Sequence, residues 1–178
     1  MTAIKKEVLS FIEKLEKNNN REWFEVNKPE FKRIEAEVKH FGQKLKEALE
    51  ATEHIDGVKL FRVYRDVRFS KDKTPYKTHF GISMHREKPR HRGGYFVQLK
   101  PNENFAAVGF WDPNKEDPNI DLIRKKMFVF RKKYSDKEVL GPNFLKQLAQ
   151  DFRTVRPFLD YMSSVLTTDL NGVSLLDK

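Results

Sequence analysis

The sequence contains no cysteine in its 178 residues. This absence excludes disulfide bonds, thiolate catalysis and zinc sites built on cysteine ligands. No apolar run approaches the roughly 20 residues that span a bilayer, and the first residues lack the apolar core of a signal peptide. We therefore expect a cytoplasmic protein that makes no contact with a membrane.

Familiar catalytic and nucleotide-binding motifs are absent as well. The chain has no GxxxxGK[ST] phosphate loop, no GxGxxG fingerprint, no HExxH helix and no GxSxG elbow. Residues 112–123 begin like a calcium loop, but the sixth position is Asp117 instead of glycine and the twelfth is Ile123 instead of glutamate. We expect neither a metal ion nor a cofactor.

The net charge of +9 is concentrated in one region of the chain. Residues 59–92 hold eleven Lys or Arg side chains and three acids, which accounts for eight of the nine net charges. A field localised in this way attracts anions to one side of a molecule. The alternative is a basic surface that serves only solubility.

Hydrophobic periodicity predicts helices at both ends of the chain and strands between them. At this length we expect one α+β domain over residues 1–178, with an antiparallel sheet of about five strands and helices mainly on one face. The second helix is expected to be capped by Asn27, with Pro29 in its first turn, and to end near residue 51. Helices are predicted at 3–17, 120–125 and from 144 onward, and strands at 58–64, 79–85, 95–100, 105–111 and 127–131.

The strand at 79–85 alternates clearly. Phe80, Ile82 and Met84 point to one side, which we assign to the core. His79 and Ser83 then point to the opposite side. The residues that follow, 86–94, are expected to form a basic, flexible hairpin loop.

Residues 65–79 form the most unusual block, with five cations and two carboxylates and neither helical nor strand periodicity. This pattern predicts an ordered loop between two strands. Arginine and lysine side chains bind carboxylates and phosphates, and the aspartates would hold these cations in place. We expect an anionic ligand here, either a phosphorylated small molecule or a nucleic acid. The candidate ligand-binding residues are Arg65, Asp66, Arg68, Lys71, Asp72, Lys73, Tyr76, Lys77 and His79.

Two other interpretations of this block stay open. An enzyme that acts on a phosphate-containing substrate would place His79 or Asp72 beside that substrate. A purely structural loop would instead tie itself to the sheet through Arg–Asp pairs, with Phe69 and Tyr76 as hydrophobic anchors. Aromatic residues among the cations are also suited to stacking nucleobases. For Phe61, however, we expect a place in the core.

Several blocks of the sequence resemble a family of uncharacterised bacterial and fungal proteins, domain of unknown function 2461. These blocks are residues 11–24, 65–79, 93–99, 109–111 and 156–161. The resemblance covers most of the chain and implies membership of the family, but no activity, because none is established for it. It also implies a further, largely helical stretch after residue 111, where this chain has only the short junction 112–118.

Overall fold

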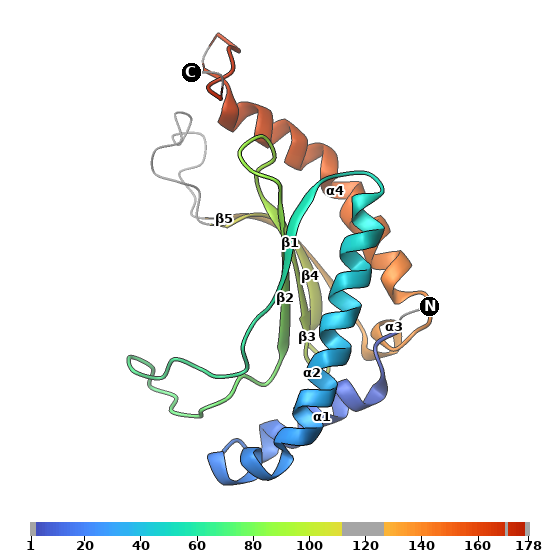
Figure 1. Cartoon of the computed structure of the whole chain (residues 1–178), viewed down its shortest axis with the longest axis vertical. Coiled ribbons are helices and arrows are strands. Elements are labelled where there is room, and N and C mark those ends of the chain that lie inside the picture. The colour runs from blue at the N-terminus through green and yellow to red at the C-terminus, as the bar shows by residue number, and fades with distance from the viewer. Residues whose placement is uncertain (1–2, 112–126, 170, 177–178) are drawn as a thin grey trace.

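Five strands form one antiparallel sheet in the order β1-β2-β3-β4-β5 (Figure 1). The structure, a computed structural model, describes residues 3–111, 127–169 and 171–176. The α+β class and the five-stranded antiparallel sheet are confirmed, whereas the helix predicted at 120–125 lies outside the described residues. The elements are α1 (Lys6–Lys17), α2 (Arg21–Glu50), β1 (Ile55–Leu60), β2 (Phe80–Arg86), β3 (Gly94–Leu99), β4 (Asn104–Trp111), β5 (Met127–Tyr134), α3 (Asp136–Val139) and α4 (Phe144–Thr167).

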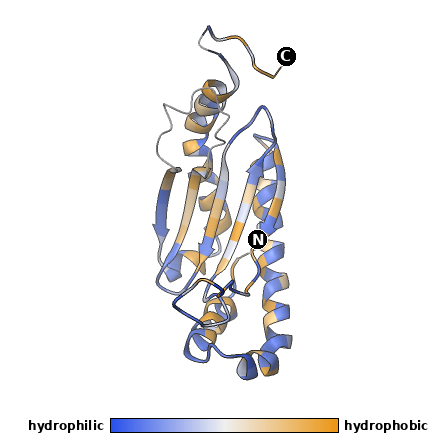
Figure 2. Cartoon of the chain, turned by 90° about the vertical axis from the view of Figure 1, so that its left-hand side faces the viewer, coloured by the Kyte–Doolittle hydropathy of each residue, from blue (hydrophilic) through white to orange (hydrophobic). Residues whose placement is uncertain are grey.

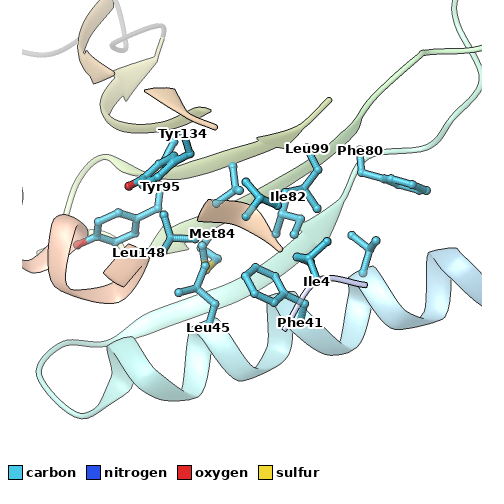
Figure 3. Packing of buried hydrophobic residues seen from close by; sticks show 14 of the residues in the cluster. Ile4, Phe41, Leu45, Phe80, Ile82, Met84, Tyr95, Leu99, Tyr134 and Leu148 are labelled. Atoms are coloured by element: carbon cyan, nitrogen blue, oxygen red, sulfur yellow. The ribbon is translucent and has the colours of Figure 1, made fainter. Parts of the chain in front are cut away.

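One face of the sheet carries the hydrophobic core. Phe80, Ile82 and Met84 are buried, as the alternation in the sequence predicted, and they pair in register with inward residues of β3. Helix α2 contacts β1 and β2, and α4 contacts β4 and α2. Figure 3 shows Phe41 and Leu45 of α2 turned toward this layer. The opposite face, called the open face below, is turned toward the viewer in Figure 2, with the helices behind it.

Helix α2 begins seven residues earlier than the sequence patterns suggested. Its N-cap is Asn20, whose side-chain oxygen accepts a hydrogen bond from the backbone N–H of Trp23 at 2.9 Å. Asn27 is not a cap, because its side chain donates to the carbonyl of Trp23 inside the helix. Pro29 therefore lies in the helix interior, where it removes one backbone hydrogen bond. Aromatic packing offsets that loss, since Phe24 stacks on Tyr76 with ring centroids 4.0 Å apart.

Two further predictions about single residues were wrong. Arg86 belongs to β2 and is only 1% exposed, whereas the sequence placed it in a flexible basic loop. Phe61 lies on the open face and is 37% exposed, although a core position was expected. The backbone N–H of Phe61 bonds to the carbonyl of Gly81, which extends the β1–β2 pairing and turns the ring outward.

No helix among the described residues is long and apolar enough to cross a membrane.

Candidate anion-binding loop

Residues 61–79 form the loop between β1 and β2, called the basic loop below, which extends from the sheet on its uncovered side (Figure 1). Its two legs pair around a bridge between Tyr64 and Tyr76. The N–H of Arg65 donates to the carbonyl of residue 75 at 2.9 Å, and the N–H of Lys77 donates to that of residue 63 at 2.7 Å. These bonds hold the base of the loop as a short ladder, so residues 66–73 form its tip.

Two contacts fasten the base of the basic loop to the helical layer. The side chain of Asn19, in the turn between α1 and α2, donates to the carbonyl of Tyr76 at 2.9 Å and accepts from its N–H at 3.1 Å. The Tyr76 ring is buried against Phe24. Tyr76 is therefore an anchor, as the structural interpretation expected. Phe69 is 96% exposed and anchors nothing.

Arg65 organises the inside of the loop. Its guanidinium donates to the carboxylate of Asp72 and to the hydroxyl of Thr74, and it lies 3.5 Å from the Ser70 hydroxyl. Asp72 also accepts from the N–H of Thr74 at 2.9 Å. The Thr74 backbone bond and the Arg65 guanidinium lower the pKa of Asp72 to about 2. Asp72 is therefore ionised near neutral pH and fully engaged within the loop.

Arg68 and Asp66 form a second pair at the tip. The guanidinium of Arg68 donates to both carboxylate oxygens of Asp66, with the Nε–Oδ1 distance at 2.9 Å. This bond lowers the pKa of Asp66 and raises that of Arg68. Both arginine forks predicted to bind a ligand are thus already occupied by aspartates of the same loop.

Four other cations of the basic loop have no such partner. Within the described residues, no carboxylate lies within 4.0 Å of Arg62, Lys71, Lys73 or Lys77. Lys73 instead donates to the carbonyl of residue 67, at 3.0 Å. Burial, with the nearby charge of Arg62, lowers the pKa of Lys77. The two aspartates therefore neutralise two of six cations, and the loop keeps a positive field.

A hollow of about 450 Å³, called the loop hollow below, lies between the base of the loop and the end of α1. Of the nine predicted site residues it brings together Arg65, Asp72, Tyr76, Lys77 and His79, while Asp66, Arg68, Lys71 and Lys73 lie outside its lining. Its remaining lining residues are Glu16, Asn19, Thr74 and Thr78.

His79 stands where the basic loop enters β2. Burial lowers its pKa below the ordinary value of 6.5, and the charges of Lys77 and Lys100 lower it further. The imidazole is therefore neutral near pH 7 and has a lone pair available to accept a proton or a hydrogen bond.

A buried ionic network that the sequence patterns did not indicate lies at the other end of β2. Arg86 donates from Nε to Glu53 at 2.8 Å and from a terminal nitrogen to Asp160. The Tyr95 hydroxyl donates to the other oxygen of Glu53, and burial together with this bond raises the pKa of Tyr95. The network joins the α2–β1 turn, two strands and α4, and Ser163 of α4 closes it at 3.4 Å from Arg86.

A signal for Arg86 was present in the sequence. Phe80, Ile82 and Met84 alternate toward the core, and the next inward position is residue 86. The predicted strand stopped at residue 85, so Arg86 was assigned to the loop that follows and not to the core face. No comparable signal exists for Glu53, because its partners lie 33 and 42 residues further along the chain.

Comparison with known proteins identifies a family but no function. The family described as conserved hypothetical protein (DUF2461) matches residues 7–118 and 114–161. The two matched stretches overlap at 114–118, inside the junction where the sequence resemblance implied a longer helical stretch. No curated protein and no solved structure matches the chain significantly.

Proposed function

Since the chain belongs to the conserved hypothetical family DUF2461, whose description states no activity, we propose from geometry alone that its basic loop binds a phosphorylated anion. The observation that carries this proposal is the set of four loop cations with no carboxylate within 4.0 Å in the described residues: Arg62, Lys71, Lys73 and Lys77. Arginine matches the geometry of a phosphate with two parallel hydrogen bonds, and lysine binds phosphate as a point charge.

The internal pairs support this function by ordering the loop before a ligand arrives. The Arg65 guanidinium makes hydrogen bonds to residues 70, 72 and 74, and the two hydrogen bonds of the Asn19 side chain fix the backbone of Tyr76. A loop that is already ordered loses less conformational entropy on binding. The aspartates thus act as internal counter-ions that position the loop, while the unpaired lysines remain available for the ligand.

The position of Lys77 supports an approach of the ligand along the side of the loop that faces the sheet. Lys77 lines the loop hollow, and its ammonium also lies 5.6 Å from the ring centroid of Phe61 on the open face. A phosphate bound by Lys77 therefore sits between the loop hollow and the sheet. Lys71 and Lys73 at the tip are exposed and can turn toward the same ligand.

Calorimetric titration with inorganic tripolyphosphate at low salt tests this function. The variant Lys71→Gln/Lys77→Gln removes two of the cations, and Lys6→Gln/Lys39→Gln removes two exposed helical lysines as a control of equal charge. Exposed ion pairs contribute about 0.2–1 kcal/mol each. We expect the loop variant to bind roughly 2- to 30-fold more weakly and the control to bind nearly as well as the wild type. Equal affinity of both double variants would refute a site in the basic loop.

An enzymatic role for the loop hollow is the second candidate, and it rests on His79. Asp72 is engaged by Arg65 and Thr74, which leaves the neutral imidazole as the candidate base among the predicted site residues. Release of inorganic phosphate from p-nitrophenyl phosphate or a nucleoside triphosphate, lost in His79→Gln, would support this role. No release above buffer controls would leave binding as the function.

A further inference from the structure

The open face of the sheet carries aromatic and cationic side chains at positions that are paired from strand to strand. Across the five strands, one row consists of Lys59, Ser83, Phe96, Ala107 and Arg131, each paired with the next. A phenylalanine thus lies at the middle of the row and a cation at each end. With about 4.8 Å between neighbouring strands, the two cations stand roughly 19 Å apart.

The adjacent row extends the aromatic surface. The Phe61 and Phe96 ring centroids are 6.1 Å apart, and those of Phe96 and Phe105 are 5.7 Å apart. Gly81 lies beneath the first two rings, since a Cβ there would stand 3.2 Å from both. The absence of a side chain at Gly81 lets the rings lean over the strand, and they form an aromatic platform of tilted rings, with interplanar angles of 60° between Phe61 and Phe96 and 43° between Phe96 and Phe105.

The platform borders a hollow of about 560 Å³, called the face hollow below. Trp111, which is 40% exposed, lines it together with the phenylalanines. Ser83 also lines it, is only 7% exposed, and its hydroxyl has no hydrogen-bond partner within the described residues. Most buried hydroxyl groups in proteins make a hydrogen bond. A bound ligand can supply the hydrogen-bond partner that the Ser83 hydroxyl lacks among the described residues.

The charges of the face specify the chemistry of that ligand. Lys59 and Lys77 lie 5.5 and 5.6 Å from the Phe61 ring centroid, and the guanidinium of Arg131 lies 3.7 Å from that of Phe105. No carboxylate among the described residues lies within 4.0 Å of these cations. A second copy of the chain is disfavoured as the occupant, because a two-fold contact would bring like charges together.

We propose that the open face binds single-stranded nucleic acid, with bases stacked on Phe61, Phe96 and Phe105 and phosphates held by the cations beside them. Proteins that bind single strands combine aromatic stacking positions with a positively charged track for the backbone. The inference rests on the proposed function for its phosphate contacts, since Lys77 belongs to both the basic loop and the edge of this face. It adds the class of ligand and the place of the bases.

The test compares two fluorescent probes of about 15 nucleotides, a length within the range of single-strand binding sites. One is oligo-dT, and the other is an abasic strand with the same phosphates and no bases. Fluorescence anisotropy at low salt should show that the full chain binds oligo-dT more tightly. Phe96→Ala and Phe61→Ala should each weaken oligo-dT binding by roughly 5- to 150-fold and leave the abasic probe unaffected. Phe130→Ala is the matched control, because Phe130 is half exposed on the opposite side of β5.

Tryptophan fluorescence gives a second measurement that does not depend on the alanine variants. The chain has two tryptophans, so Trp23→Phe leaves Trp111 as the single emitter. Stacked bases should quench Trp111 on addition of oligo-dT, whereas the abasic strand should not. Circular dichroism of each variant establishes that it is folded.

The outcomes separate the two proposals. Equal affinity for both probes, or wild-type binding by the folded Phe96→Ala and Phe61→Ala variants, would overturn the platform and leave the basic loop as the site. A change in oligomeric state of Phe96→Ala, measured by light scattering without loss of oligo-dT affinity, would identify the face as a self-association surface and also overturn the inference. No binding of either probe, together with no binding of tripolyphosphate, would remove the phosphate site as well.

Discussion

Removal of Arg86 should cost this protein a large share of its stability. Its guanidinium lies between Glu53 and Asp160, and the side chains of Arg86 and Glu53 are 1% and 3% exposed. In Arg86→Met, the carboxylate of Glu53 stays buried and, among the described residues, keeps the Tyr95 hydroxyl as its one side-chain partner. Asp160 loses less, because it is partly exposed and retains Arg156 at 3.2 Å.

The expected magnitude follows from the geometry of the network. Breaking a buried ion pair by removing one partner costs about 3–5 kcal/mol. For a domain of this size, each kcal/mol lowers Tm by about 2–4 °C, so Arg86→Met should lower Tm by roughly 6–20 °C. Glu53→Gln should cost less, about 1.5–3 kcal/mol, because Arg86 keeps Asp160 as a partner. The double variant should be more stable than the sum of the two single effects predicts, since it leaves no unpaired carboxylate at residue 53.

Urea unfolding at neutral pH, followed by circular dichroism, measures these free energies. Arg68→Ala serves as the control, because its ion pair with Asp66 is exposed and should leave Tm unchanged. An unfolding midpoint of Arg86→Met equal to that of the wild type would contradict a stabilising role of this network. Strictly additive effects of Arg86→Met and Glu53→Gln would contradict a direct interaction between the two side chains.

Three further predictions concern the sheet and the basic loop. Gly109→Ala should lower the free energy of unfolding by more than about 4 kcal/mol or prevent folding, because the added Cβ would lie 1.9 Å from a carbonyl oxygen of β5. Gly57→Ala should be tolerated in the same urea unfolding assay, because an added Cβ there meets nothing within 4 Å. Tyr76→Ala should destabilise the chain by about 3–5 kcal/mol and Phe69→Ala by less than about 0.5, so similar urea midpoints for the two would contradict the anchor role of Tyr76. Because the folded-state pKa of His79 is lowered, the unfolded chain takes up the proton on this ring at a higher pH than the folded chain does. The contribution of the neutral ring to the free energy of unfolding is therefore fully present above pH 6.5 and is lost as the pH falls below 6.5. His79→Gln should flatten the stability profile below about pH 6.5, and an unchanged slope there would show that His79 is not responsible.

The architecture could be predicted because it depends on local periodicity. Alternation at Phe80, Ile82 and Met84 identified the core face of β2, and helical spacing identified α1. The start of α2 could not be placed, because Pro29 normally marks a first turn and the aromatic contacts that carry the helix through it come from distant residues.

The candidate site was also predictable only where it depends on residues close together in the sequence. The sequence indicated that the aspartates hold the cations of the loop, and the pairs of Asp66 with Arg68 and of Asp72 with Arg65 agree with this. Which cations remain unpaired depends on distances that no pattern contains. The outward turn of Phe61 likewise follows from its pairing with Gly81, a residue on another strand.

The central claim is that the unpaired cations of the basic loop bind a phosphorylated anion, and an NMR titration tests it most directly. Uniformly ¹⁵N-labelled protein would be titrated with inorganic tripolyphosphate at low salt, and the shift of each backbone amide would be followed. We predict that the largest shifts fall on residues 70–79, with little change in the exposed lysines of α1. Shifts spread evenly over all basic segments, or none in the loop at saturating ligand, would contradict the claim.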